Sequence, residues 1–157
     1  GKMLLRIDHA DPGVARTIES VAATITQLAD RRIMCMLEPL PYVTDDSGRA
    51  RLDRSDEQLI KVVAIASGLG SSSAYTWLKI PGSDRMAEVA ASTTLPVLML
   101  GGDPGADADQ TFDRWESCMR EPNVRGLVAG RALLYPHGGD PELAVGHAAR
   151  IVHGGAR

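Results

Sequence analysis

Short apolar runs alternate with amphipathic segments along the chain, and this alternation limits the fold more than any other feature of the sequence. Each run has the length and composition of a buried strand. A strand–helix unit repeated five times predicts a parallel α/β sheet with right-handed crossovers. The runs are Met3–Ile7, Ile33–Leu37, Tyr75–Ile80, Val97–Leu100 and Gly126–Ala129.

The segments between these runs carry the signals of helices. The first has apolar residues at steps of three and four from Val14 to Leu28, which gives one apolar stripe. Asp11 followed by Pro12 has the composition of a helix cap and first turn. Ser55 with Gln58 three residues later matches a capping box. We expect the later helices at 55–69, 83–91, 112–119 and 140–154.

Two architectures fit this order of elements. One is a complete, open, five-stranded doubly wound sheet, which suits a chain of 157 residues. The other is part of a (β/α)8 barrel, which normally needs ~250 residues. The chain begins almost directly with a strand-like run, and we take this abrupt start as a sign of a partial barrel.

Composition excludes several classes of function. The net charge is -3 and no basic patch stands out, so we expect no nucleic-acid partner. No apolar stretch approaches ~18 residues, so we expect no membrane span. Cys35 and Cys118 have no CxxC spacing, and the histidines have no metal-ligand spacing, so we expect no metal. A reduced, cytoplasmic setting is the simplest interpretation.

Polar residues inside or just after the apolar runs are the candidates for chemistry, because the active sites of parallel α/β folds lie at the carboxyl ends of the strands. Lys79 lies in the apolar run TWLKIPG. Burial disfavours the charged form of an amine, and a neutral amine is the nucleophile that forms an imine with a carbonyl. Glu38 leaves the preceding run and is placed to move protons. A purely structural ion pair between the two is the alternative.

Two glycine turns follow the last two runs. Gly101–Gly102 and Gly130–Arg131 lie where the phosphate sites of many barrels are found. Exposed backbone N–H groups form an anion cradle, and an arginine adds a charged hydrogen bond. We also expect a long polar loop at Pro41–Arg54, which is either functional or a solvated excursion.

The series KMLLRID, MLEPLPY, WLKIPG, LPVLMLGGD and GLVAGRALLYP resembles the class I, Schiff-base aldolases of the tagatose-bisphosphate and deoxyribose-phosphate aldolase group. It is most similar to aldolase-like barrels associated with inositol catabolism. The resemblance implies a (β/α)8 barrel of which residues 1–157 form the C-terminal five-eighths, from the fourth strand to the eighth helix. The three N-terminal strand–helix units would then be missing, and we expect association with another copy through the open edge.

The resemblance also implies roles for individual residues. Lys79 would form the Schiff base and Glu38 would assist proton transfer. Lys2 would approach the substrate near the imine, and Asp8 matches an acid at the end of the same strand. The two glycine turns and Arg131 would hold the substrate phosphate. Arg6, beside Asp8, is a departure from the family pattern and a further candidate for substrate binding.

These inferences predict an aldehyde-lyase that cleaves a phosphorylated keto-sugar and needs no metal or organic cofactor. Two alternatives remain at this point. One is a sugar-phosphate isomerase or epimerase on the same barrel, with Glu38 as base and Lys79 as an electrostatic group. The other is a non-catalytic α/β binding module.

Overall fold

The computed structural model describes residues 1–102, 108–136 and 139–154. Their strands form one sheet in the order β1-β2-β4-β5-β6, with β3 paired to β2 alone, and all pairs except β2–β3 are parallel. The strands are β1 Lys2–Ile7, β2 Cys35–Thr44, β3 Ala50–Leu52, β4 Thr76–Ile80, β5 Val97–Leu100 and β6 Val124–Val128. The helices are α1 Val14–Asp30, α2 Asp56–Ser67, α3 Met86–Ala91, α4 Ala108–Cys118, α5 Arg131–Leu134 and α6 Pro141–His153.

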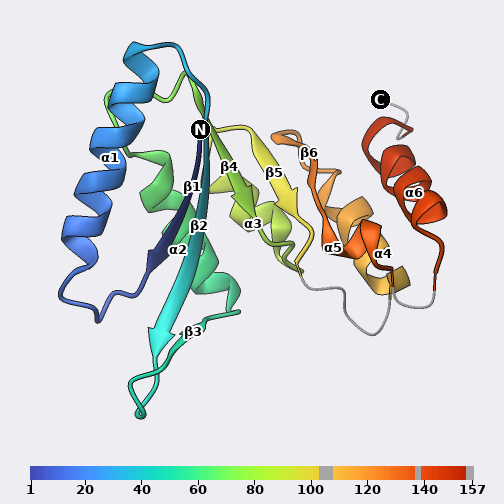
Figure 1. Cartoon of the computed structure of the whole chain (residues 1–157), viewed down its shortest axis with the longest axis horizontal. Helices are drawn as coiled ribbons and strands as arrows, with labels where there is room; N and C mark the ends of the chain where they lie inside the picture. Colours follow the sequence, from blue (N-terminus) through green and yellow to red (C-terminus); the bar gives the residue numbers. More distant parts are fainter. Residues whose placement is uncertain (103–107, 137–138, 155–157) are drawn as a thin grey trace.

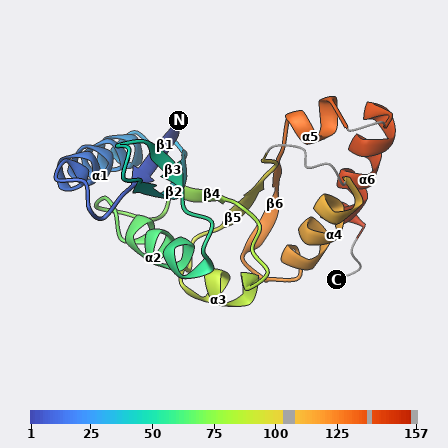
Figure 2. The same cartoon turned by 90° about the horizontal axis from the view of Figure 1, so that it is seen from below.

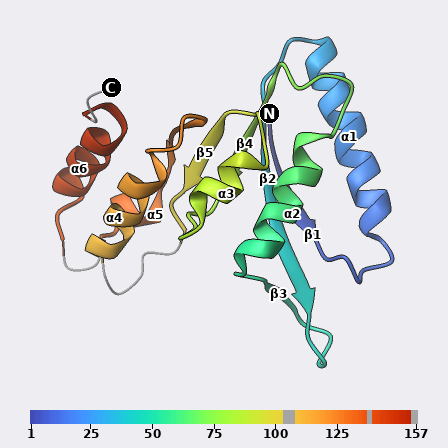
Figure 3. The same ribbon diagram turned by 180° about the vertical axis from the view of Figure 1, so that it is seen from behind.

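The sheet is curved, and its long helices follow the outer side of the curve (Figure 2). Figure 3 shows α2 in front of β2, with α1 to the right of β1. The strands that run parallel follow one another in chain order, whereas a doubly wound sheet reverses direction and carries helices on both faces. The prediction of a parallel α/β fold is therefore confirmed, and of its two possible architectures the structure has the partial barrel. Within the described residues β1 and β6 are the two edges, so the sheet does not close.

The core lies between the sheet and these helices. Alternate residues of each strand, such as Leu5, Leu37 and Leu78, are fully buried on the helix-covered face. Burying a side chain of this size contributes about 1.5–3 kcal/mol. Ile25 of α1 is buried in this layer as the apolar stripe predicted, and Trp115 of α4 packs there too. The remaining strand residues face the other way, onto a surface that we call the inner face.

The predicted loop at Pro41–Arg54 is wrong, because half of it forms two paired strands. β2 continues through Pro41 to Thr44 and turns back into β3, which forms a hairpin that extends beyond the carboxyl ends of the neighbouring strands (Figure 1). The strand expected from the sequence ended at Leu37, but Pro39 and Pro41 lie within β2 although proline cannot donate to a strand ladder. The Asp45 carboxylate closes the hairpin by accepting hydrogen bonds from the backbone of Ser47 and Arg49.

Other boundaries also differ from the sequence-based expectation. The second strand begins at Cys35, because the N–H of Ile33 bonds to the carbonyl of Leu28 and closes α1. The N-cap of α1 is Gly13, and Asp11 instead accepts a hydrogen bond from the Gly13 N–H at 2.7 Å. Ser55 occupies the N-cap of α2 but makes no side-chain capping bond. The cap at Asp140 with Pro141 in the first turn is confirmed.

No helix in the three described ranges has both the length and the apolar character needed to cross a membrane.

Candidate active site

Three charged side chains from three neighbouring strands meet on the inner face. Lys79 Nζ of β4 lies 3.1 Å from Glu38 Oε1 of β2. Lys2 Nζ of β1 lies 2.6 Å from the other oxygen, Glu38 Oε2. The register explains this meeting: Leu37 pairs with Leu78 across β2 and β4, so the next residues on both strands, Glu38 and Lys79, face the same side. The structure thus brings together three of the residues singled out in the sequence.

Burial distinguishes the two amines. The side chain of Lys79 is 16% exposed and that of Glu38 is 11% exposed, whereas that of Lys2 is 44% exposed. Burial raises the pKa of Glu38, but the hydrogen bonds from Lys2 and Lys79 outweigh it and hold that pKa below its ordinary value. The chain has only three lysines, Lys2, Lys61 and Lys79, so two of the three share one carboxylate. A carboxylate held ionised beside an amine is placed to accept a proton from it.

The contacts between β1 and β2 continue toward the carboxyl ends of the strands. Lys2 pairs in register with Met36 but reaches Glu38, two residues further along β2. The guanidinium of Arg6 lies 5.0 Å from the ring centroid of Tyr42. The Lys2 and Arg6 side chains therefore both lean toward the carboxyl end of β2. The sequence already placed Tyr42 after Glu38 at the exit of the second strand, and the two-residue alternation Glu38, Leu40, Tyr42 puts its side chain on the same face as that of Glu38.

Asp8 has partners of its own at the end of β1. Its carboxylate accepts hydrogen bonds from the hydroxyl of Thr44 at 2.8 Å and from the N–H of Ala10 at 3.0 Å. The hydrogen bond from Thr44, followed by that from Ala10, holds the pKa of Asp8 below its ordinary value. In the described part of the chain, no hydrogen bond joins Asp8 to Glu38 or Lys79. Asp8 thus fixes the hairpin to the end of β1.

The two glycine turns lie side by side at the carboxyl ends of β5 and β6. A Cβ on Gly101 would lie 2.8 Å from the Cα and Cβ of Ala129, so this close approach requires glycine. Gly102 has a φ of 64°, which also favours glycine. Gly130 precedes the short helix α5, which the sequence did not predict, and Arg131 is its first residue. The turns lie at the same end of the sheet as Lys79.

Replacing Gly101 by alanine is expected to destabilise the protein by about 1–3 kcal/mol, because the ends of β5 and β6 must separate to admit the methyl group. Gly146→Ala in α6 is the matched control. Its new Cβ would meet only the Arg150 guanidinium at 3.7 Å, so we expect a gain of about 0.5–1 kcal/mol from helix propensity. Urea unfolding of both variants measures the difference. Equal effects of the two substitutions would contradict the close approach at Gly101.

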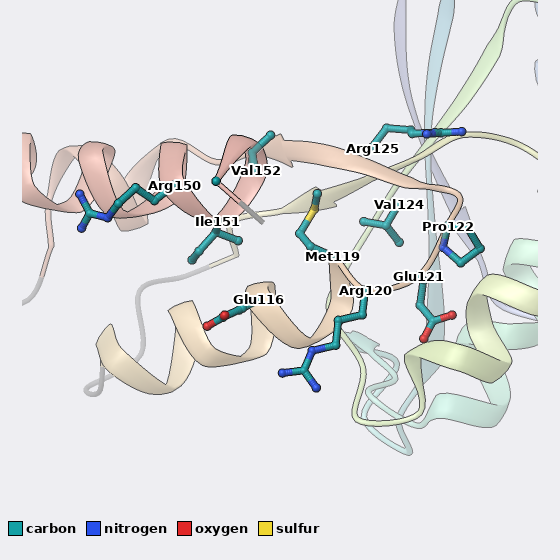
Figure 4. A pocket seen from close by; sticks show the side chains of 11 residues that line it. Glu116, Met119, Arg120, Glu121, Pro122, Val124, Arg125, Arg150, Ile151 and Val152 are labelled. Atoms are coloured by element: carbon teal, nitrogen blue, oxygen red, sulfur yellow. The ribbon is translucent and has the colours of Figure 1, made fainter. Parts of the chain in front are cut away.

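A cavity of about 960 Å³ lies elsewhere, between α4, the start of β6 and α6 (Figure 4). Its lining is apolar at Met119, Val124 and Ile151 and charged at its rim, where Arg120 and Arg150 point in different directions (Figure 4). It contains neither Lys79 nor Glu38. The paired amine and carboxylate are the groups with the chemistry of a nucleophile and a base, so we place the candidate active site on the inner face.

Among the described residues, no three His, Cys, Asp or Glu side chains are grouped to hold a metal ion.

Comparison with known proteins adds to this geometry. A family model described as Cgl0159-like matches residues 1–149. The crystal structure of Cgl0159 from Corynebacterium glutamicum matches with a TM-score of 0.90 and 44% identity, over 99% of this chain and 52% of that one. No curated protein sequence matches the chain.

Two archaeal structures are similar at lower identity. A fructose 1,6-bisphosphate aldolase matches with a TM-score of 0.75 and 18% identity, over 97% of this chain and 57% of that one. An aldolase structure with the catalytic lysine covalently bound to the carbinolamine intermediate matches with a TM-score of 0.70 and 18% identity, over 95% and 57%. The fold is therefore class I aldolase-like. The chain spans little more than half the length of each of these proteins.

Proposed function

We propose that this chain, which belongs to the Cgl0159-like family, carries the Schiff-base lysine and the acid–base residue of a class I aldolase that cleaves a phosphorylated keto-sugar. The observation that supports this most strongly is the Lys79–Glu38 pair, with Nζ and Oε1 3.1 Å apart near the carboxyl end of β4. The archaeal relatives of similar fold include one whose catalytic lysine forms a carbinolamine with substrate, which makes imine chemistry the natural use of this amine.

The pair accounts for each proton transfer of the reaction. Glu38 takes a proton from the Lys79 ammonium, and the free amine attacks the substrate carbonyl to form a carbinolamine. Glu38 then returns the proton to the departing hydroxyl, so that water leaves and an iminium ion remains. Glu38, ionised again, takes the proton from the hydroxyl on the far carbon of the bond to be broken, so that this bond breaks, an aldehyde leaves and an enamine remains on Lys79. Protonation and hydrolysis of the enamine regenerate the amine.

Other residues complete the proposal. Lys2 binds the second oxygen of Glu38 and keeps the carboxylate oriented toward Lys79. Gly101, Gly102, Gly130 and Arg131 would hold the substrate phosphate at the ends of β5 and β6. Asp8 is proposed to act at the β1 end of the site through the hairpin it anchors.

The wider assignments rest on the sequence resemblance alone. These are a role in inositol or related carbohydrate catabolism, a cytoplasmic location, and a likeness to the tagatose-bisphosphate group. Residues 1–157 would correspond to the barrel from its fourth strand to its eighth helix, and a second copy or further chain would cover the open edge.

Incubation with phosphorylated ketoses in the presence of a metal chelator tests the proposed reaction. We expect an aldehyde and a ketone, each with fewer carbons than the substrate, at a rate that the chelator leaves unchanged, because an imine replaces the metal ion as electron sink. Products with the same number of carbons would instead identify an isomerase or epimerase. Loss of activity in chelator would overturn the Schiff-base proposal.

A further inference from the structure

The cavity between α4, the start of β6 and α6 has the size of a small-molecule site. Its volume is about 960 Å³, and pockets that bury small ligands have volumes of roughly 300–1,000 Å³. The cavity lies at the starting end of β6, whereas Lys79 lies near the carboxyl end of β4, and both strands run parallel to β5 between them. A ligand in the cavity is therefore at the opposite end of the sheet from Lys79 and is not the molecule that reacts there.

An aromatic contact holds α4 against α6 beside this cavity. The ring of Phe112 stacks on that of His147, with 4.4 Å between centroids and an interplanar angle of 24°, and Trp115 packs edge-on against Phe112. Met119 lies four residues after Trp115 and lines the cavity. Ile151 lies four residues after His147 and lines it too, so each is one turn beyond the contact on the same helix face. The two helices thus touch at the aromatic rings and present an apolar floor one turn further on.

Three arginines stand at the rim of the cavity without an ion pair. Arg120, Arg125 and Arg150 line it and are exposed, and none of them takes part in the ion pairs of the described ranges. In the view of Figure 4 the apolar side chains lie between Arg150 and Arg125. Glu116 and Glu121 are at the rim as well and are likewise not ion-paired. Cations therefore outnumber acids around the apolar floor.

A cation at the end of a helix often serves the helix itself, and this role does not account for these arginines. Arg31 at the end of α1 has it, because its guanidinium donates a hydrogen bond to the carbonyl of Gln27 at 2.9 Å. Arg120 follows α4 and Arg150 lies in the last turn of α6, but in the part of the chain that the structure describes neither guanidinium bonds to a helix carbonyl. Their N–H donors stay available to a ligand, and their stems extend the apolar lining.

We propose that this cavity binds an amphipathic anion, a single-chain molecule with an apolar body and a carboxylate or phosphate head. The body packs on Met119, Val124 and Ile151, and the head accepts charge-assisted hydrogen bonds from the guanidinium groups at the rim. The site goes beyond the proposed aldolase function and does not depend on it. Because the ligand contacts both α4 and α6, its binding also stabilises the folded chain.

Titration calorimetry with ligands that share one alkyl chain tests the choice of head group. The probes are decanoate, decyl phosphate, decanol and decyltrimethylammonium, each below its critical micelle concentration. We expect the two anions to bind about ten- to a hundredfold more tightly than decanol, the gain typical of a charge-assisted hydrogen bond, and the cation to bind most weakly. Octanoate should bind about tenfold more weakly than decanoate, because it buries two fewer methylene groups.

Variants and NMR spectra place the ligand in the cavity. Combined replacement of Arg120, Arg125 and Arg150 by glutamine should abolish the preference for anions and leave the binding of decanol unchanged. Arg16→Gln, at an exposed position on α1, is the control and should change nothing. The chain has six methionines, and decanoate should shift the methyl signal of Met119, identified by its loss in Met119→Leu, more than those of the others.

Three results would overturn the inference: equal affinity for decanoate and decanol, a combined variant that keeps the preference, or a shift that spares Met119. Salt dependence keeps the test open if the combined variant does not fold, since added salt must weaken the binding of decanoate and not that of decanol. None of these titrations involves Lys79, so their failure would leave the aldolase proposal intact.

Discussion

Replacing Lys79 by methionine is expected to lower kcat/KM for aldol cleavage by about a thousandfold or more, because the variant has no amine to form the imine. A thousandfold loss corresponds to about 4 kcal/mol of transition-state stabilisation. Glu38 keeps its 2.6 Å contact with Lys2, so the carboxylate retains a partner and the fold should survive. Lys61→Met, at an exposed position on α2, removes the third lysine of the chain and is expected to leave activity unchanged.

The Lys79→Arg variant distinguishes the role of Lys79 as a nucleophile from the role of its positive charge. Arginine keeps the positive charge beside Glu38 but cannot form a Schiff base. We therefore expect the arginine variant to be as inactive as the methionine variant, with stability closer to that of the unchanged protein. Steady-state kinetics and urea unfolding of the two variants provide the comparison. An arginine variant with a tenth or more of the original activity would show that Lys79 acts through its charge alone.

Replacing Glu38 by glutamine is expected to lower kcat by about a hundred- to ten-thousandfold, the range for loss of a general acid–base group. It should also destabilise the fold, because Lys2 and Lys79 then face each other without a carboxylate between them. We expect about 1–3 kcal/mol, less than for a fully buried pair, because the side chain of Lys2 is nearly half exposed. Glu116→Gln, an exposed carboxylate on α4, should change neither quantity.

The stability difference for Glu38→Gln should depend on pH. Burial raises the pKa of Glu38, but the hydrogen bonds from Lys2 and Lys79 hold it below the ordinary value of 4.5. Its ionised form therefore stabilises the folded protein fully above that pH, and the contribution is lost as pH falls through the lower pKa of the folded state. Urea unfolding from neutral to acidic pH should show the two proteins converge in stability. A difference that persists unchanged in acid would contradict the ion-pair account.

The general architecture and the central pair were predictable from the sequence. Parallel strands that are covered on both faces produce apolar runs, and a charged residue inside such a run stands out. Lys79 in TWLKIPG and Glu38 in MCMLEPLPY are such residues. Their convergence followed from the rule that parallel strands end at the same edge. Which atoms meet depends on the register between β2 and β4, and no local pattern encodes that register.

Features that depend on contacts between distant segments were not predictable. Pro39 and Pro41 favour the end of a strand, yet pairing with β1 carries β2 as far as Pro41, and pairing with β3 carries it on to Thr44. The contact of Arg6 with Tyr42 exists only because that extension occurs. The glycine turn at Gly101 was interpreted as a ligand cradle, and its close approach to Ala129 shows that packing alone already requires glycine there.

Reduction with borohydride in the presence of a phosphorylated ketose, followed by peptide mass spectrometry, tests the central claim most directly. The chain has only three lysines, so the modified position can be assigned without ambiguity. We expect the mass of the reduced substrate on the peptide that contains Lys79, and unmodified peptides for Lys2 and Lys61. A peptide of Lys79 that remains unmodified with every ketose phosphate, or an adduct found on Lys2 instead, would contradict the assignment of Lys79 as the nucleophile.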